Sequence, residues 1–151
     1  MQGCMSNYTI GSEFEKIFKK LAQMYGICVI NIPQNQYMRH TKAPFDYILA
    51  FMGKNVFVDT KSHQGHALNY SKITTHQKES LLSLERHGCR SGYVVWYRDI
   101  NKVVFYTAGQ LNKVCGNESL SPEQGYDLGT METMNLRKLF NARWTSDGLQ
   151  D

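Results

Sequence analysis

Three charged side chains that together could hydrolyse a phosphodiester lie in one short segment, APFDYILAFMGKNVFVDTK, at residues 43–61. Asp46 belongs to the first of two apolar runs, and Asp59 and Lys61 lie two apart on the second. Carboxylates are natural ligands of Mg²⁺, which takes one or two of them and keeps several waters. A lysine near such an ion can orient a nucleophilic water or stabilise charge on a phosphate. The residue types therefore suit metal-assisted phosphodiester hydrolysis.

The two apolar runs predict a β-hairpin that would bring these groups together, with a Gly-Lys-Asn turn at residues 53–55. Because side chains alternate faces along a strand, Asp59 and Lys61 point the same way, and the hairpin can place Asp46 beside them. Both acids lie in apolar strand sequence, where desolvating an unpaired carboxylate is costly. This setting favours a compensating cation over an ordinary surface role. A lysine that closes a strand can also be a protective edge charge.

Helices and further strands are predicted around the hairpin. Residues 12–25 and 75–87 carry apolar side chains at helical spacing, and each segment is followed by or ends near a glycine. Short apolar runs predict the remaining elements, which are strands at 27–32, 93–97 and 102–106 and a helix at 108–114. The order α-β-β-β-α-β-β-α predicts an α/β domain with a mixed central sheet flanked by helices.

The length of 151 residues predicts one main domain, because the chain is too short for two of ordinary size. Composition changes after residue 116, where GNESLSPEQGYDLGT is rich in glycine, serine and acids. We therefore expect a compact domain at 1–116 and a looser C-terminal extension at 117–151. The segment METMNLRKLFNARW in that extension predicts one more short helix.

Charge and cysteine content bear on the partners and the cellular compartment of the protein. The net charge of +4 is compatible with a polyanionic partner, although such a charge is also common without one. The four cysteines lie far apart with no CxxC pair, so neither a zinc site nor a disulfide framework is indicated. No run reaches the length of a membrane-spanning helix, and the N-terminal residues lack the pattern of a signal peptide. We expect a cytoplasmic protein without a membrane partner.

Two further side chains have both a structural and a chemical interpretation. Glu15 lies three residues after Ser12, so it could complete a capping box at the start of the first helix. Its alternative is a further carboxylate near the metal. Gln77 stands in the same relation to Thr74 at the start of the second helix.

The ordered motifs resemble the PD-(D/E)XK nuclease superfamily and, within it, the RecU-type Holliday junction resolvases. GSEFE is similar to the family's Gly-x-x-(aromatic or aliphatic)-Glu helix, which carries the N-terminal acid over to Glu15. FDYILAFMGKNVFVDTK is similar to the family's Asp-Tyr-x-Gly-x-Tyr-x-Gly followed by a strand that ends in Glu-Ala-Lys. That likeness assigns Asp46, Asp59 and Lys61.

The resemblance continues through NYSKITTHQKESLLSLERHGCRSGYVVWY, where His76 and Gln77 match a His-Gln pair that opens a helix. It covers residues 11–111, about two thirds of the chain. Three departures stand out. Asp59 replaces a glutamate, a change that the superfamily pattern allows, and Phe45 and Leu49 replace a common proline and glycine. The loop before the hairpin is also short for the stalk that RecU proteins insert into a junction.

The resemblance implies a restriction-endonuclease-like core and the activity of a Mg²⁺-dependent endonuclease, with Mn²⁺ as a substitute. Lys61 would position the attacking water and stabilise the pentavalent phosphate, and Gln77 would hold water or backbone near the site. The family pattern implies one or two metal ions, whose ligands would be Asp46, Asp59, the carbonyl of Thr60 and Glu15.

The implied activity is symmetric cleavage of DNA four-way junctions in recombination and repair, by a homodimer whose two sites make matching nicks. Two alternatives stay open. One is a less structure-selective DNA endonuclease of restriction or repair type that uses the same site. The other is a non-catalytic DNA-binding homologue that keeps the fold without turnover.

Overall fold

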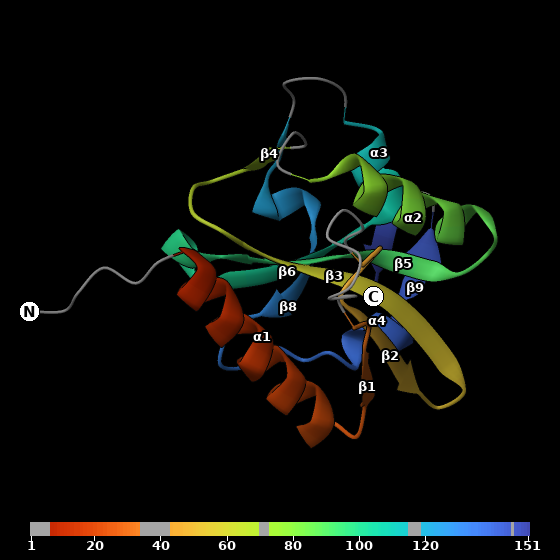
Figure 1. Cartoon of the computed structure of the whole chain (residues 1–151), viewed down its shortest axis with the longest axis horizontal. Coiled ribbons are helices and arrows are strands. Elements are labelled where there is room, and N and C mark those ends of the chain that lie inside the picture. The colour runs from red at the N-terminus through yellow and green to blue at the C-terminus, as the bar shows by residue number, and fades with distance from the viewer. Residues whose placement is uncertain (1–6, 34–42, 70–72, 115–118, 146) are drawn as a thin grey trace, which may run out of the picture.

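A mixed six-stranded sheet forms the centre of the molecule, with strand order β1-β2-β3-β5-β6-β8. The computed structural model describes residues 7–33, 43–69, 73–114, 119–145 and 147–151 (Figure 1). Neighbouring strands are antiparallel except for β3 and β5, which are parallel. The strands of this sheet are β1 (Cys28–Asn31), β2 (Tyr47–Phe51), β3 (Lys54–His63), β5 (Arg90–Tyr97), β6 (Lys102–Thr107) and β8 (Tyr126–Gly129).

Helices α1 (Asn7–Met24) and α2 (Thr75–Arg86) pack against opposite faces of this sheet. Phe14 and Phe18 of α1 belong to one buried cluster, and Leu81 of α2 belongs to a second. Successive residues of β5 alternate between the clusters, as the twofold periodicity of a strand requires. Figure 1 shows β3 passing between the two helices.

The predicted hairpin is present, with a turn slightly different from the expected one. Met52 and Gly53 form it, both with positive φ, and Lys54 already pairs with Phe51. Positive φ at both central residues is the twist that two-residue hairpins prefer, and glycine adopts it without strain. The register pairs Tyr47 with Val58, which places Asp46 beside Asp59.

The expected α/β class and the order of elements through α3 (Ala108–Asn112) are confirmed, with the short strand β4 (Leu68–Asn69) added before α2. The first helix begins earlier than expected, at Asn7 rather than Ser12. None of the helices described in this structure combines the length and apolar character needed to cross a membrane. The smaller elements are η2 (Arg98–Ile100), β7 (Ser119–Leu120), η3 (Pro122–Gln124), α4 (Lys138–Asn141), β9 (Arg143–Thr145) and β10 (Gly148–Gln150).

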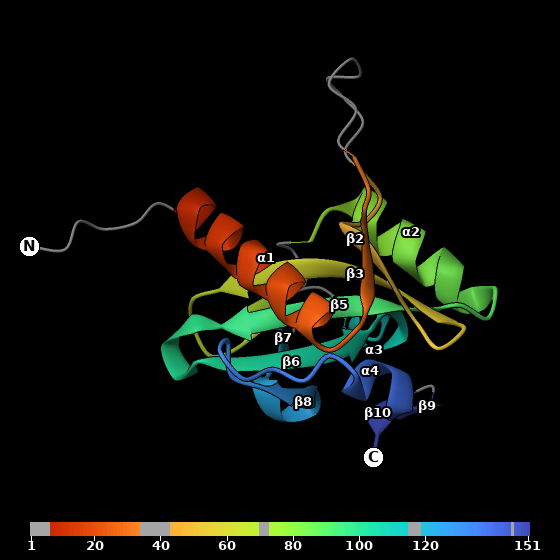
Figure 2. The same ribbon diagram turned by 90° about the horizontal axis from the view of Figure 1, so that it is seen from below.

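The residues after 118 belong to the same core as the rest of the domain, which corrects the expected boundary after residue 116. Strand β8 pairs with β6 at one end of the central sheet. Met134, Leu136 and Phe140 are buried in the cluster that contains Phe14 of α1. The described part of the polar stretch that suggested an extension contains β7, η3 and β8, and the apolar residues beyond it complete the core. Figure 2 shows α4, β9 and β10 gathered near the C-terminus.

Candidate active site

Strand β3 continues past Val58, which pairs with Tyr47, the first residue of β2. The side chain of Asp46 lies beside this part of β3, which has no partner in β2. The backbone N–H of Asp46 donates to the carbonyl of Val58 (3.1 Å). Asp46 Oδ2 then accepts hydrogen bonds from the Thr60 backbone N–H (2.8 Å) and the Thr60 hydroxyl (2.9 Å). A carboxylate therefore replaces a strand as the partner of β3 at this position. Because N–H and C=O of one strand residue face the same side, the Thr60 carbonyl is directed toward Asp46 as well.

Asp59 and Lys61 project from the α2 face of β3, as their two-residue spacing predicts. Their side chains form an ion pair, with Lys61 Nζ 2.9 Å from Asp59 Oδ2. Asp59 is completely buried, whereas the Lys61 side chain keeps 26% of its surface exposed. The lysine is therefore engaged with an acid and is not only a protective edge charge.

Gln77 connects these two charges from the first turn of α2. Its Nε2 donates to Asp59 Oδ1 (3.3 Å), and its Oε1 accepts from Lys61 Nζ (3.1 Å). The Thr74 hydroxyl accepts from the Gln77 backbone N–H (3.3 Å), so half of the expected capping box is present. The reciprocal hydrogen bond, from the Thr74 backbone N–H to the Gln77 side chain, is absent in this turn because that side chain contacts β3. His76, which the family resemblance also singled out, is exposed.

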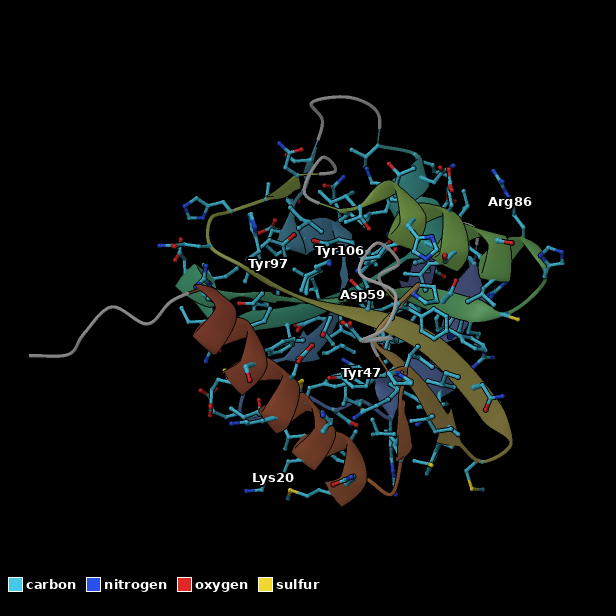
Figure 3. The ribbon with its side chains drawn as sticks, viewed as in Figure 1. Lys20, Tyr47, Asp59, Arg86, Tyr97 and Tyr106 are labelled. Carbon is cyan, nitrogen blue, oxygen red and sulfur yellow. The ribbon has the colours of Figure 1, made fainter. Side chains whose placement is uncertain are left out.

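Glu15 reaches the site from α1, on the other face of β3. The capping role considered for it is wrong, because α1 begins at Asn7 and Ser12 lies within the helix. Glu15 is half-buried, and its Oε1 lies 3.4 Å from the Thr60 hydroxyl. The site thus draws on both faces of the sheet, since Thr60 alternates with Asp59 and Lys61 along β3. Figure 3 shows Asp59 and Tyr47 in the region between α1 and α2.

Three carboxylates interact in this region, and their charge is incompletely compensated. Burial raises the pKa of Asp59 to about 7, and the Asp46 charge adds to this, although the Lys61 ammonium opposes it. Burial and the Asp46 charge also raise the pKa of Glu15. Asp59 Oδ2 contacts the lysine as an ion pair but has no hydrogen-bond partner among the described residues. Additional positive charge at this point would stabilise the ionised acids.

The donor set fits a hard divalent cation that retains water. Within the described ranges, no three His, Cys, Asp or Glu side chains are already spaced as ligands of one metal ion. Mg²⁺ needs no such closed set, because one or two carboxylates and several waters complete its octahedron. Asp46 and the under-compensated Asp59 supply that pair, with the Thr60 carbonyl on the same side of β3 as Asp46.

Tyr47 also lies beside the site, and sequence reasoning assigned it no role. It packs on the α1 face of the sheet with Val58, and burial, followed by the charges of Glu15, Asp46 and Asp59, raises the pKa of its hydroxyl. Alternation along β2 directs Tyr47 away from the face that carries Asp59. Only the position of α1, which brings Glu15 over that face, reveals this influence.

Comparison with known sequences found no matching family model and no matching curated protein. Comparison with solved structures found a match to Hjc, a Holliday junction resolvase from the archaeal hyperthermophile Archaeoglobus fulgidus. The match has a TM-score of 0.59 and 14% sequence identity, and it covers 78% of this chain and 95% of that chain. At this identity the likeness concerns the fold, and it agrees with the restriction-endonuclease-like class expected from the sequence.

Proposed function

We propose that this protein is a divalent-metal-dependent DNA endonuclease that cleaves four-way junctions. The observation that carries the proposal is the convergence of Asp46, Asp59 and Lys61 at one point of β3, joined there by Glu15 from α1 and Gln77 from α2. These side chains come from α1, β3, α2 and the residue that precedes β2. A buried acid beside a second carboxylate is costly to maintain without a compensating function.

The side chains of this chain have distinct roles in the proposed reaction. Asp46 and Asp59, with the Thr60 carbonyl, would hold Mg²⁺ or Mn²⁺, and Glu15 adds a further carboxylate. When bound, such an ion lowers the pKa of a water and neutralises charge on the phosphate. Lys61 is held between Asp59 and Gln77, where its ammonium would orient the attacking water or stabilise charge on a phosphate oxygen. Gln77 holds the Asp59 carboxylate and the Lys61 ammonium in one arrangement.

Junction specificity has two supports, the ordered motif resemblance to RecU-type resolvases and the fold likeness to Hjc. The RecU subtype itself stays a prediction. A resolvase that nicks two strands symmetrically needs two matching sites, so we further propose a homodimer with twofold symmetry. The corresponding cellular process is DNA recombination and repair in the cytoplasm.

A cleavage assay tests this proposal. The protein is incubated with Mg²⁺ and synthetic four-way, three-way and linear duplexes of matched sequence. Asp59→Asn removes a proposed metal ligand, and Asp127→Asn removes an exposed acid of β8 as the matched control. We expect symmetric nicks in four-way junctions with the wild type and the control, and none with Asp59→Asn.

The other outcomes identify the alternatives. Equal cutting of linear duplex would replace the junction assignment with a less structure-selective endonuclease. Binding of DNA without any cut, unchanged by Asp59→Asn, would replace the enzyme with a DNA-binding protein.

A further inference from the structure

Strand β1 forms one end of the central sheet, and no strand among the described residues pairs with its outer edge. On its inner side it pairs with β2 in an unbroken register from Cys28–Ala50 to Asn31–Tyr47. Cys28, Ile30 and Asn31 are exposed. The strand contains neither a charged residue nor a proline, the two kinds of residue that commonly protect an exposed edge. The edge is therefore open to pairing with another strand.

The hydrogen-bond pattern decides which backbone groups this edge presents. The Ile32 N–H donates to the Asp46 carbonyl (3.0 Å), so these two residues form a hydrogen-bonded pair. Hydrogen-bonded and non-hydrogen-bonded pairs alternate along an antiparallel ladder, so Ile30 also directs its backbone groups toward β2. Val29 and Asn31 then direct theirs outward. The free edge thus offers two N–H donors and two carbonyl acceptors.

The side chains of the same strands form an apolar row that stops at this edge. Ile30 lies opposite Ile48, and Ile48 lies opposite Phe57, so one apolar side chain from each of β1, β2 and β3 shares the α2 face. Ile48 and Phe57 pack against the cluster that contains Leu81. Ile30, the last member of the row, is 46% exposed. A further apolar neighbour beyond β1 would complete the row.

We propose that two copies of this chain dimerise by antiparallel pairing of their β1 strands across a twofold axis at Ile30. Val29 of each copy then lies opposite Asn31 of the other, and the outward donors and acceptors of both edges are satisfied by four hydrogen bonds. The two Ile30 residues face each other as a non-hydrogen-bonded pair, with Cα atoms about 4.5 Å apart. The apolar row then continues from one sheet into the other, and the neutral strands do not repel each other.

Other registers satisfy the edge less completely. An axis at Val29 would place Asn31 opposite Ile27, whose N–H already donates to a carbonyl of α1. An axis at Asn31 would place Val29 opposite Pro33, which has no N–H. In either case one outward carbonyl of each copy would stay unpaired. The axis at Ile30 is the register in which both outward residues find full partners.

This inference rests on the homodimer in the proposed function and assigns its surface. A twofold axis between antiparallel strands is normal to the sheet, so the α2 faces of both copies, with Asp59 and Lys61, lie on the same side. Five strand spacings separate the two β3 strands, which is about 24 Å. Asp59 is level with Ile32, two residues from the axis, so the sites are offset by about 13 Å along the strands. One branched DNA molecule could contact both sites.

The first test measures association of the full chain by sedimentation equilibrium, without DNA or Mg²⁺. Ile30→Lys is compared with Ile100→Lys, because both isoleucines are 46% exposed. We expect a dimeric wild type, an unchanged control and dimerisation at least about 100-fold weaker for Ile30→Lys, since two ammonium groups would meet on the axis and apolar burial would be lost in both copies. A monomeric wild type, or equal association of the two variants, would overturn the inference.

Disulfide cross-linking tests the register. Ile30→Cys is made in a Cys28→Ser background and oxidised with oxidised glutathione, beside Ile100→Cys in the same background. The Cα separation expected at Ile30 lies within the range of a disulfide, so Ile30→Cys should give a covalent dimer on a non-reducing gel. The control should give no more than the Cys28→Ser parent. A dimeric Ile30→Cys protein that does not cross-link would show that this register is wrong.

The outcomes separate this inference from the proposed nuclease activity. A dimer that depends on Ile30 but cuts no DNA would refute the nuclease and leave the interface standing. Paired nicks made by a monomer, or by a dimer that Ile30→Lys leaves intact, would refute the interface and leave the metal site standing. If both proposals hold, Ile30→Lys should convert paired nicks into single nicks at protein concentrations where the wild type is dimeric, because its own active-site residues are unchanged.

Discussion

Replacing Asp59 with asparagine should stabilise the metal-free protein at neutral pH although it removes a proposed metal ligand. The pKa of Asp59 is raised from 3.8 to about 7 in the folded chain, mainly by burial. Each pKa unit corresponds to about 1.4 kcal/mol, so the ionised carboxylate lowers folding stability by roughly 4 kcal/mol. Asparagine is nearly isosteric and carries no charge, so it avoids this cost.

The sign of the pH dependence follows from the direction of the shift. The folded protein holds the Asp59 proton more tightly than the unfolded chain does, so this group lowers stability as pH rises from about 4 to about 7. Once the pH lies well above 7, the loss is complete and constant. The stability difference between Asp59→Asn and the wild type should therefore be small near pH 4 and reach its full value well above pH 7.

Urea denaturation in EDTA at several pH values measures this difference, with Asp127→Asn as the control for loss of an exposed acid. Mg²⁺ should then stabilise the wild type by mass action and leave Asp59→Asn nearly unaffected. A stability difference that does not change with pH would refute the assignment of a buried, under-compensated charge to Asp59. Equal stabilisation of both proteins by Mg²⁺ would refute its role as a metal ligand.

Four further substitutions test other parts of the site and the sheet. Lys61→Met should reduce kcat at least about a hundredfold while junction binding by gel shift persists, because it removes the oriented ammonium and keeps the aliphatic stem; unchanged kcat would contradict its role. Gln77→Leu should reduce kcat about tenfold through loss of its contacts to Asp59 and Lys61. Thr74→Ala should instead cost about 1 kcal/mol in chemical denaturation with kcat unchanged, because it removes only the helix cap; equal kcat effects in both variants would show that helix fraying is responsible. Gly92→Ala should destabilise the protein by about 3 kcal/mol or more, because its Cβ would lie 2.2 Å from the Tyr106 carbonyl; a wild-type Tm in thermal denaturation would contradict this close approach.

The hairpin and its charged residues could be predicted because the relevant information is local. The period-two spacing of Asp59 and Lys61 depends on neighbouring residues only. The hairpin is equally local, although its turn at Met52 and Gly53 is shorter and starts one residue earlier than the sequence predicts, and this turn sets the register. Alternation along β3 then decides which side chains face α2. The position of Asp46 beside Asp59 follows from that register.

The contributions of α1 and of the C-terminal residues could not be predicted because they depend on tertiary packing. The helix start at Asn7 removed the capping interpretation of Glu15, and helix boundaries are the least local part of such a pattern. The influence of Glu15 on Tyr47 depends on where α1 crosses the sheet. Likewise, Met134 and Leu136 follow a polar, glycine-containing stretch, and only their burial shows that they complete the core.

The parallel pairing of β3 with β5 has a consequence for how the protein is made. Asp59 lies opposite Tyr93, and α2 with Gln77 lies in the connection between the two strands. During synthesis from the N-terminus, β3 emerges well before the residues that bury Asp59 and orient Lys61. Pairings that are distant in sequence form late because loop closure must come first. A growing chain therefore carries all three hairpin charges without an assembled site, so the proposed cleavage would begin only after the sheet has closed.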